Sequence, residues 1–318
     1  MKKKIPRLAL GTVQFGHKYG FKNTVINKQK EINKILNLLN KKKIKMIDTA
    51  SDYSKSEKRI GKYSKKNSFK IISKIPKIKS KIITNKDILI LEKKFQTSLK
   101  NLNRKKIYGL LVHSFEDILK QGSEYLIDFL RNLKKKGYVK KIGISVYNPN
   151  EFYKAIKIFD LDIVQFPLNI LDQRFLRIKL SSYKKIEFFA RSIFLQGLLL
   201  QNYNNINSFF NPIKKKLIKF KKYLEKKKNI NSFFNQIKKK LIKLKKYLEK
   251  KKISQLEACI TFALEQKNIG YLVFGVDSYD EFKEIIKIKK SKEKIQFSKF
   301  AMNKSQYIDP RNWKINNA

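Results

Sequence analysis

The sequence has few of the residues that bind metal ions or form disulfides. Among 318 residues there are one cysteine, Cys259, and two histidines, His17 and His113. An intramolecular disulfide is therefore excluded, and a metal site built from cysteine or histidine is not expected. No apolar run approaches the roughly 20 residues of a transmembrane helix. Pro6 and Arg7 interrupt the basic start, so we expect no secretion signal and a cytoplasmic protein.

Negative charge is also scarce. The 75 Lys and Arg residues oppose 25 Asp and Glu residues, which gives a net charge of +50. Such an excess is typical of proteins that bind polyanions. Only eight of these cations are arginines, although specific phosphate and base contacts favour the planar arginine fork. A chain rich in Lys, Ile and Asn is also expected from AT-rich codons. We therefore predict solvated lysines and no specific nucleic-acid partner.

Hydrophobic residues make up 42% of the chain, which predicts a folded core. Short apolar runs alternate with amphipathic stretches along most of its length. The predicted strands are residues 7–13, 44–49, 69–75, 107–113, 140–146, 162–166, 186–192 and 270–275. The predicted helices are residues 28–42, 54–65, 85–101, 122–136, 149–158, 172–183, 254–267 and 278–290. Eight such units predict one (β/α)8 TIM barrel over residues 1–318, of which 291–318 form a C-terminal tail.

A tandem duplication interrupts this pattern at residues 206–252. Residues 206–228 and 230–252 differ only at Pro212/Gln236 and Phe220/Leu244. Each copy has apolar residues at spacings of four, three and four, which predicts one helical stripe per copy. We interpret the segment as a lysine-rich helical insertion after strand seven, with two helices joined by a turn near Asn229. A surface helix is the favoured interpretation. A membrane-surface helix, a partner-binding hairpin and a nucleic-acid-binding arm are alternatives.

Polar side chains stand at or just after the ends of three consecutive predicted strands. Asp48 ends the second strand, Tyr53 lies in the loop after it, Lys74 ends the third strand and His113 ends the fourth. Because these strand ends converge in a (β/α)8 barrel, we expect the four side chains to meet.

This set suits the reduction of a carbonyl group. Tyr53 would donate the proton, and Lys74, oriented by Asp48, would lower the pKa of the phenol. A neutral His113 would orient the carbonyl oxygen and stabilise its developing charge. Since no side chain supplies hydride, a cofactor must do so.

The segments around these residues resemble the aldo/keto reductase family. The resemblance covers roughly residues 5–200 and 253–290. It is carried above all by Ile47 to Gly61 (IDTASDYSKSEKRIG), Val112-His113, Gly137 to Ser145 (GYVKKIGIS) and Ser192 to Leu198 (SIFLQGL). The resemblance implies a barrel that reduces an aldehyde or ketone with NAD(P)H. It also implies a catalytic tetrad of Asp48, Tyr53, Lys74 and His113.

The same resemblance implies a set of cofactor-binding residues, which are Gly11, Thr12, Asp48, Ser145, Gln165, Ser192, Gly197, Gly275 and Ser278. Several positions depart from the family pattern, which are Val146, Arg191, Asp277, Glu281 and Ile285. Arg191 replaces the aromatic residue that commonly stacks on nicotinamide. Asp277 stands where an arginine often grips the 2′-phosphate. An acidic residue there suits a free ribose hydroxyl, although Ser278 and Lys283 are placed to compensate. The family itself favours NADP(H) over NAD(H).

Residues Ile163 to Arg174 (IVQFPLNILDQR) and Asp309 to Trp313 resemble a bacterial branch that is often associated with sugar or surface-polysaccharide metabolism. They predict a sugar-derived carbonyl substrate. Tyr307 and Trp313 are expected either to cover the barrel mouth or to pack on its wall.

Two other functions stay open: a regulatory barrel that binds cofactor but catalyses weakly, and a basic protein that binds membranes or nucleic acid through the repeats. The sequence predicts no oligomeric state.

Overall fold

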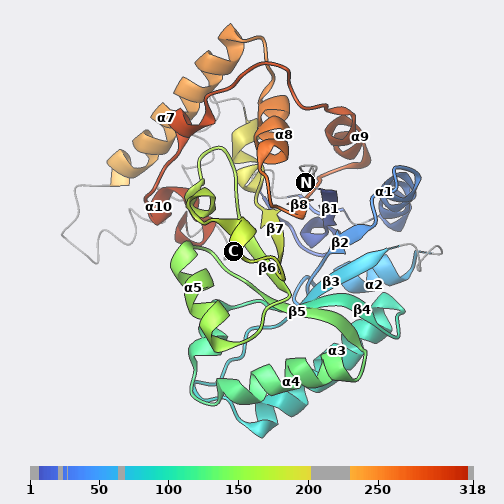
Figure 1. Cartoon of the computed structure of the whole chain (residues 1–318). Coiled ribbons are helices and arrows are strands. Elements are labelled where there is room, and N and C mark those ends of the chain that lie inside the picture. The colour runs from blue at the N-terminus through green and yellow to red at the C-terminus, as the bar shows by residue number, and fades with distance from the viewer. Residues whose placement is uncertain (1–6, 21–23, 27, 64–68, 202–229, 314–318) are drawn as a thin grey trace.

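Eight parallel strands close into a barrel in the order β1 to β8 (Figure 1). The computed structural model describes residues 7–20, 24–26, 28–63, 69–201 and 230–313. The strands are β1 (Arg7–Gly11), β2 (Met46–Asp48), β3 (Lys70–Ile75), β4 (Ile107–Val112), β5 (Val139–Ser145), β6 (Ile163–Pro167), β7 (Glu187–Arg191) and β8 (Tyr271–Phe274). Pairing of β1 with β8 completes the closure. The predicted (β/α)8 barrel is confirmed, and every predicted strand is found.

Helices surround the barrel on its outside (Figure 1). They are α1 (Gln29–Lys41), α2 (Ser56–Gly61), α3 (Asn85–Leu102), α4 (Ser123–Lys135), α5 (Pro149–Ile158), α7 (Ile230–Lys250), α8 (Gln255–Glu265), α9 (Tyr279–Lys287) and α10 (Ser305–Ile308). In α1 the buried residues are Ile32, Ile35, Leu36 and Leu39. This spacing places them on one face, which explains why the segment forms a helix against the sheet.

The helix predicted at residues 172–183 is absent from the structure. That segment forms two short 3-10 turns, Arg174–Arg177 and Leu180–Ser182. Just before it, Asn169 Oδ1 accepts hydrogen bonds from the backbone N–H groups of Leu171 and Asp172, both at 3.0 Å, which forms a turn at the start of the segment.

The second copy of the duplication forms α7, which packs beside α8 and α10 (Figure 1). Its apolar stripe is fully buried and consists of Ile237, Leu241, Leu244 and Leu248. The helix begins at Ile230, so Asn231 and Ser232 lie inside its first turn and not in the predicted break. The first copy, residues 206–228, lies outside the described residues. Among those described, no helix has the length and apolarity needed to cross a membrane.

The interior of the barrel is filled by a separate layer of apolar side chains. The buried residues of this layer are Ala9, Met46, Ile72, Leu111, Ile163, Phe189, Tyr271 and Val273. Strand β5 contributes Gly143 at this level, where a Cβ atom would lie 2.0 Å from the Ile163 carbonyl oxygen. The layer is therefore closely packed, and it forms a solid floor beneath the carboxyl ends of the strands.

Candidate active site

The site is built from the next layer of inward-facing positions. Successive side chains of a strand point to opposite faces, so the residue two positions beyond each floor residue also points inward. Applied to each strand, this rule gives Gly11, Asp48, Lys74, His113, Ser145, Gln165, Arg191 and Gly275. All eight line one cavity of about 400 Å³ at the carboxyl ends of the strands.

The structure brings together most of the residues that the sequence singled out. The four tetrad positions Asp48, Tyr53, Lys74 and His113 all line this cavity. The cofactor positions that also line it are Gly11, Thr12, Ser145, Gln165, Ser192, Gly197 and Gly275. Ser278 does not line it, because its hydroxyl oxygen accepts a hydrogen bond from the Glu281 backbone N–H at the start of α9.

A buried ion pair lies at the base of the cavity. Lys74 Nζ lies 2.8 Å from each carboxylate oxygen of Asp48 and donates a third hydrogen bond, of 2.9 Å, to the Thr49 carbonyl. Gln165 Nε2 donates a further bond of 2.8 Å to Asp48 Oδ1. Full hydrogen bonding offsets the cost of removing both charges from water. The pair is thereby held in one geometry.

The phenol of Tyr53 does not behave as the sequence predicted. Burial raises its pKa well above the ordinary value, and the negative charge of Asp48 raises it further. Lys74 lies 5.5 Å from the Tyr53 ring centroid and is paired with Asp48, and the net effect of the surroundings on the phenol is a raised pKa. The expected lowering of the Tyr53 pKa by Lys74 is therefore wrong for this state of the protein. The phenol stays protonated and holds a proton to donate.

His113 lies beside Tyr53, with 6.0 Å between ring centroids and an edge-on arrangement. Burial, together with the positive charges of Lys74 and Arg191, lowers the pKa of His113 to about 3. The imidazole is therefore neutral near pH 7, as the sequence analysis expected. A neutral ring can donate one hydrogen bond without adding charge to the site.

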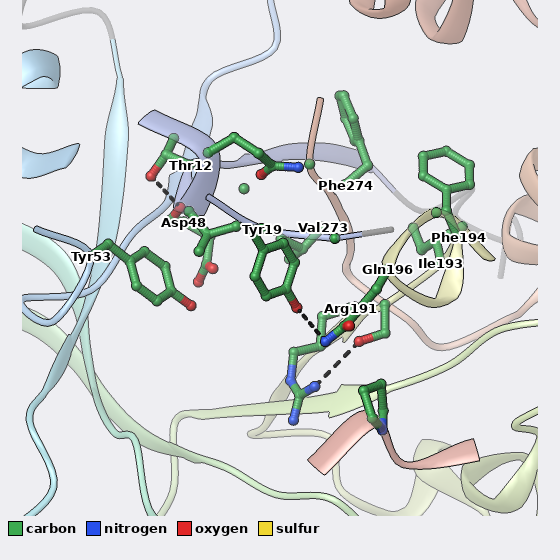
Figure 2. Close-up of a pocket in the computed structure, with 18 of the residues that line it drawn as sticks. Thr12, Tyr19, Asp48, Tyr53, Arg191, Ile193, Phe194, Gln196, Val273 and Phe274 are labelled. Carbon is green, nitrogen blue, oxygen red and sulfur yellow. Dashed lines mark hydrogen bonds between the residues drawn. The ribbon is translucent and has the colours of Figure 1, made fainter. Parts of the chain in front are cut away.

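Two loops contribute cavity residues that the sequence analysis did not identify. Tyr19, from the loop after β1, has its hydroxyl 3.2 Å from Gln196 Nε2, which donates to it from the loop after β7 (Figure 2). Three non-glycine residues of the second loop, Ser192, Leu195 and Gln196, have left-handed backbone, with φ of 61°, 48° and 57°. Strained backbone of this kind is frequent at functional sites. The position of both loops directly after strand ends is the sequence signal from which these residues could have been identified.

The C-terminal tail also reaches the cavity. Pro310 and Arg311 line it, whereas Tyr307 is buried against the barrel. The side chain of Trp313 lies outside the described residues. Tyr147, which the sequence analysis missed, also lines the cavity, and the Arg311 guanidinium stacks 3.2 Å from its ring centroid. The tail thus both packs on the wall and contributes to the rim.

Two carboxylates, Asp277 and Glu281, line the end of the cavity that lies beyond β8. Asp277 Oδ1 accepts hydrogen bonds from Thr24 Oγ1 and Gln14 Nε2, and Glu281 accepts one from the backbone N–H of Asp277. The cationic side chains of the cavity lining are Lys74, Arg191 and Arg311, and they belong to other strands and to the tail. Among the lining residues, the two carboxylates are thus the charged groups at this end of the cavity.

The donors and acceptors of the cavity fit a nicotinamide dinucleotide. The buried side-chain oxygen of Gln14 has no hydrogen-bond partner among the described residues. Ser145, at the end of β5, makes no side-chain hydrogen bond to another described residue and faces the cavity. Such groups match the amide and hydroxyl groups of a cofactor. Within the described part of the chain, no cluster of His, Cys, Asp or Glu is suited to a metal ion.

Comparison with known proteins agrees with this geometry. An aldo-keto reductase from Bacillus halodurans, in its holo form, superposes with a TM-score of 0.66 at 15% identity, over 97% of this chain and 100% of that one. A glycerol dehydrogenase from Gluconobacter oxydans gives 0.63 at 17% identity, over 94% and 91%. No curated protein matches by sequence. A sequence model of the Aldo/keto reductase family matches residues 7–302, and the chain therefore belongs to this family of oxidoreductases.

Proposed function

We propose that the protein reduces an aldehyde or ketone to an alcohol, with a nicotinamide cofactor as hydride donor. The observation that carries this proposal is the convergence of Tyr53, His113 and the Lys74–Asp48 ion pair on one cavity. A bound nicotinamide would supply the hydride, which no side chain can provide. The residues of the chain then bind the carbonyl and manage its proton.

Each residue has a distinct part in this mechanism. His113, neutral near pH 7, donates a hydrogen bond to the carbonyl oxygen and directs it toward the Tyr53 hydroxyl. Tyr53 donates its proton to that oxygen as negative charge develops on it. The Lys74–Asp48 ion pair lies beside the Tyr53 ring and would hold the base of the cavity in one geometry. Ser145 and Gln165, which line the cavity, would hold the carboxamide of the cofactor.

The cofactor preference follows from charge at the far end of the cavity. The family resemblance favours NADP(H). However, if the nicotinamide lies at the tetrad, the adenosine end lies toward Asp277 and Glu281, which would repel a 2′-phosphate. Ser278 caps α9, and the Lys283 ammonium lies 2.6 Å from Asp280, so neither is placed to compensate. We therefore propose NAD(H) as the preferred cofactor.

Titration of the protein with NADH and NADPH at moderate salt, read as thermal stabilisation, tests the cofactor proposal without a guess at the substrate. We expect NADH to bind at least about 10-fold more tightly. Asp277→Asn and Glu281→Gln should each reduce the difference in affinity between NADH and NADPH. Tighter binding of NADPH would contradict the proposed preference, and binding of neither would refute cofactor-dependent reduction.

A sugar-derived carbonyl remains the proposed substrate class. Oxidation of bound cofactor by a panel of aldehydes and hydroxy-ketones, with Tyr53→Phe as the control variant, tests the chemistry directly. Loss of the proton donor should slow turnover by about 10²- to 10⁴-fold. A Tyr53→Phe variant as active as the wild type would favour the alternative of a regulatory barrel that binds cofactor.

A further inference from the structure

Arg191 adds a positive charge to the layer of inward-facing residues that contains Asp48, Lys74 and His113. It stands two residues beyond the floor residue Phe189 and, from β7, faces the cavity. Its Nη1 donates a hydrogen bond of 3.3 Å to Ser192 Oγ, and its Nη2 donates one of 3.4 Å to the Val146 carbonyl. Its guanidinium lies 4.2 Å from the ring centroid of Tyr147. All these partners are neutral.

Other arginines near the cavity are paired with carboxylates. Arg311 contacts both carboxylate oxygens of Asp309, with Nη2 at 2.7 Å, and Arg174 pairs with Asp172 at 2.8 Å. Among the described residues, no carboxylate forms an ion pair with Arg191. The structure thus places a half-buried guanidinium without a carboxylate partner among the described residues against the cavity, where a bound anion would neutralise it.

The charges that face Arg191 from the neighbouring elements do not balance it. Asp48 is paired with Lys74, and His113 is neutral near pH 7. The carboxylates of Asp277 and Glu281 line the part of the cavity beyond β8. The positive charge of Arg191 also contributes to the low pKa of His113, which shows that its field reaches the reacting groups.

Resting on the carbonyl reduction proposed above, we propose that Arg191 binds an anionic group of the substrate, a carboxylate or a phosphate, so that the enzyme prefers anionic carbonyl compounds. A planar guanidinium matches both groups through two parallel hydrogen bonds. Figure 2 shows Tyr53 and Arg191 apart from each other with Tyr19 between them; Tyr53 lies in the loop after β2, and Arg191 ends β7. A substrate held at both places has its carbonyl at Tyr53 and its anion at Arg191. The phosphate groups of the cofactor are the other anions that the Arg191 guanidinium would bind in the same way.

A matched pair of substrates distinguishes binding of a substrate anion by Arg191 from binding of the cofactor phosphates. 4-Carboxybenzaldehyde and its uncharged methyl ester differ only in the anion, so the ratio of their kcat/KM values reports on its recognition. Arg191→Met keeps the apolar stem and removes the charge, and Arg191→Lys keeps the charge but loses the fork. Arg131→Met, on the outer face of α4 beside Asp128, is the control for a lost surface charge.

We expect the wild type to favour the carboxylate and Arg191→Met to lower that ratio by about 10- to 100-fold. Arg191→Lys should retain part of the preference, and Arg131→Met should leave the ratio as in the wild type. An unchanged ratio in Arg191→Met would overturn the proposal. So would weakened NADH binding at a constant ratio, which would assign Arg191 to the phosphates of the cofactor.

A measurement of ligand binding tests the role of Arg191 even if the protein reduces neither aldehyde or Arg191→Met does not fold. Calorimetric titration of the wild type and Arg191→Lys with benzoate and benzamide should show binding of benzoate alone, weaker in the variant. Equal binding of both compounds, or benzoate binding that Arg191→Lys leaves unchanged, overturns the role of Arg191. Failure of the wild type to reduce either aldehyde, with NADH bound, would instead refute the proposed function.

Discussion

The neutral state of His113 makes protein stability depend on pH. Its pKa is lowered to about 3 in the folded protein, from an ordinary value of 6.5. The folded protein therefore binds fewer protons than the unfolded chain between these values. The stability contributed by the neutral ring is complete above pH 6.5 and is lost as the pH falls toward 3. One proton per molecule corresponds to a slope of about 1.4 kcal/mol per pH unit.

The ring meets some solvent in the cavity, which reduces this slope. We expect His113 to account for a loss of about 2 kcal/mol in the free energy of unfolding between pH 6.5 and pH 4.5. His113→Gln cannot titrate in this range, so the difference between wild type and variant removes the contributions of other groups. Urea unfolding at half-unit pH steps measures it. Parallel pH profiles for the two proteins would refute the argument that His113 is held neutral by burial.

The ion pair and the duplicated segment give further tests by urea unfolding. Lys74→Met leaves a buried Asp48 charge and should cost about 3–5 kcal/mol, whereas Lys74→Met combined with Asp48→Asn should cost less than the sum of the single changes. Leu241→Ala empties a buried position of α7 and should cost about 2–5 kcal/mol. Deletion of residues 206–229 should change the free energy of unfolding by less than about 1 kcal/mol, because α7 supplies the buried stripe. A larger loss on deletion would mean that the first copy also packs on the barrel.

Periodicity explains why the barrel and the convergence of Asp48, Lys74 and His113 on one cavity could be predicted from the sequence. Strands buried on both faces are short continuous apolar runs, and such runs precede Asp48, Lys74 and His113 directly. A polar residue at the end of such a run lies at the mouth of the barrel. Because alternation fixes which side chains point inward, strand position alone placed these residues in one cavity.

The features that the sequence did not predict depend on contacts between distant segments. Arg311 reaches the cavity only because the tail folds back across the barrel to Tyr147. The pKa of Tyr53 depends on burial and on the pairing of Asp48 with Lys74, which spacing does not specify. Local sequence also misled at residues 172–183, where the predicted helix is replaced by two short 3-10 turns.

The surface charge of the chain and the charged groups of the cavity act on an anionic ligand in different ways. Although Lys and Arg number 75, Lys74 is the one lysine that lines the cavity among the described residues, and Asp48 neutralises it. Surface lysines attract anions at long range and are screened by salt within about 8 Å at physiological ionic strength. They can raise the local concentration of an anionic ligand but cannot orient it. Orientation requires a fixed, partly buried group, and Arg191, which lines the cavity from the end of β7, is the group that we propose for it.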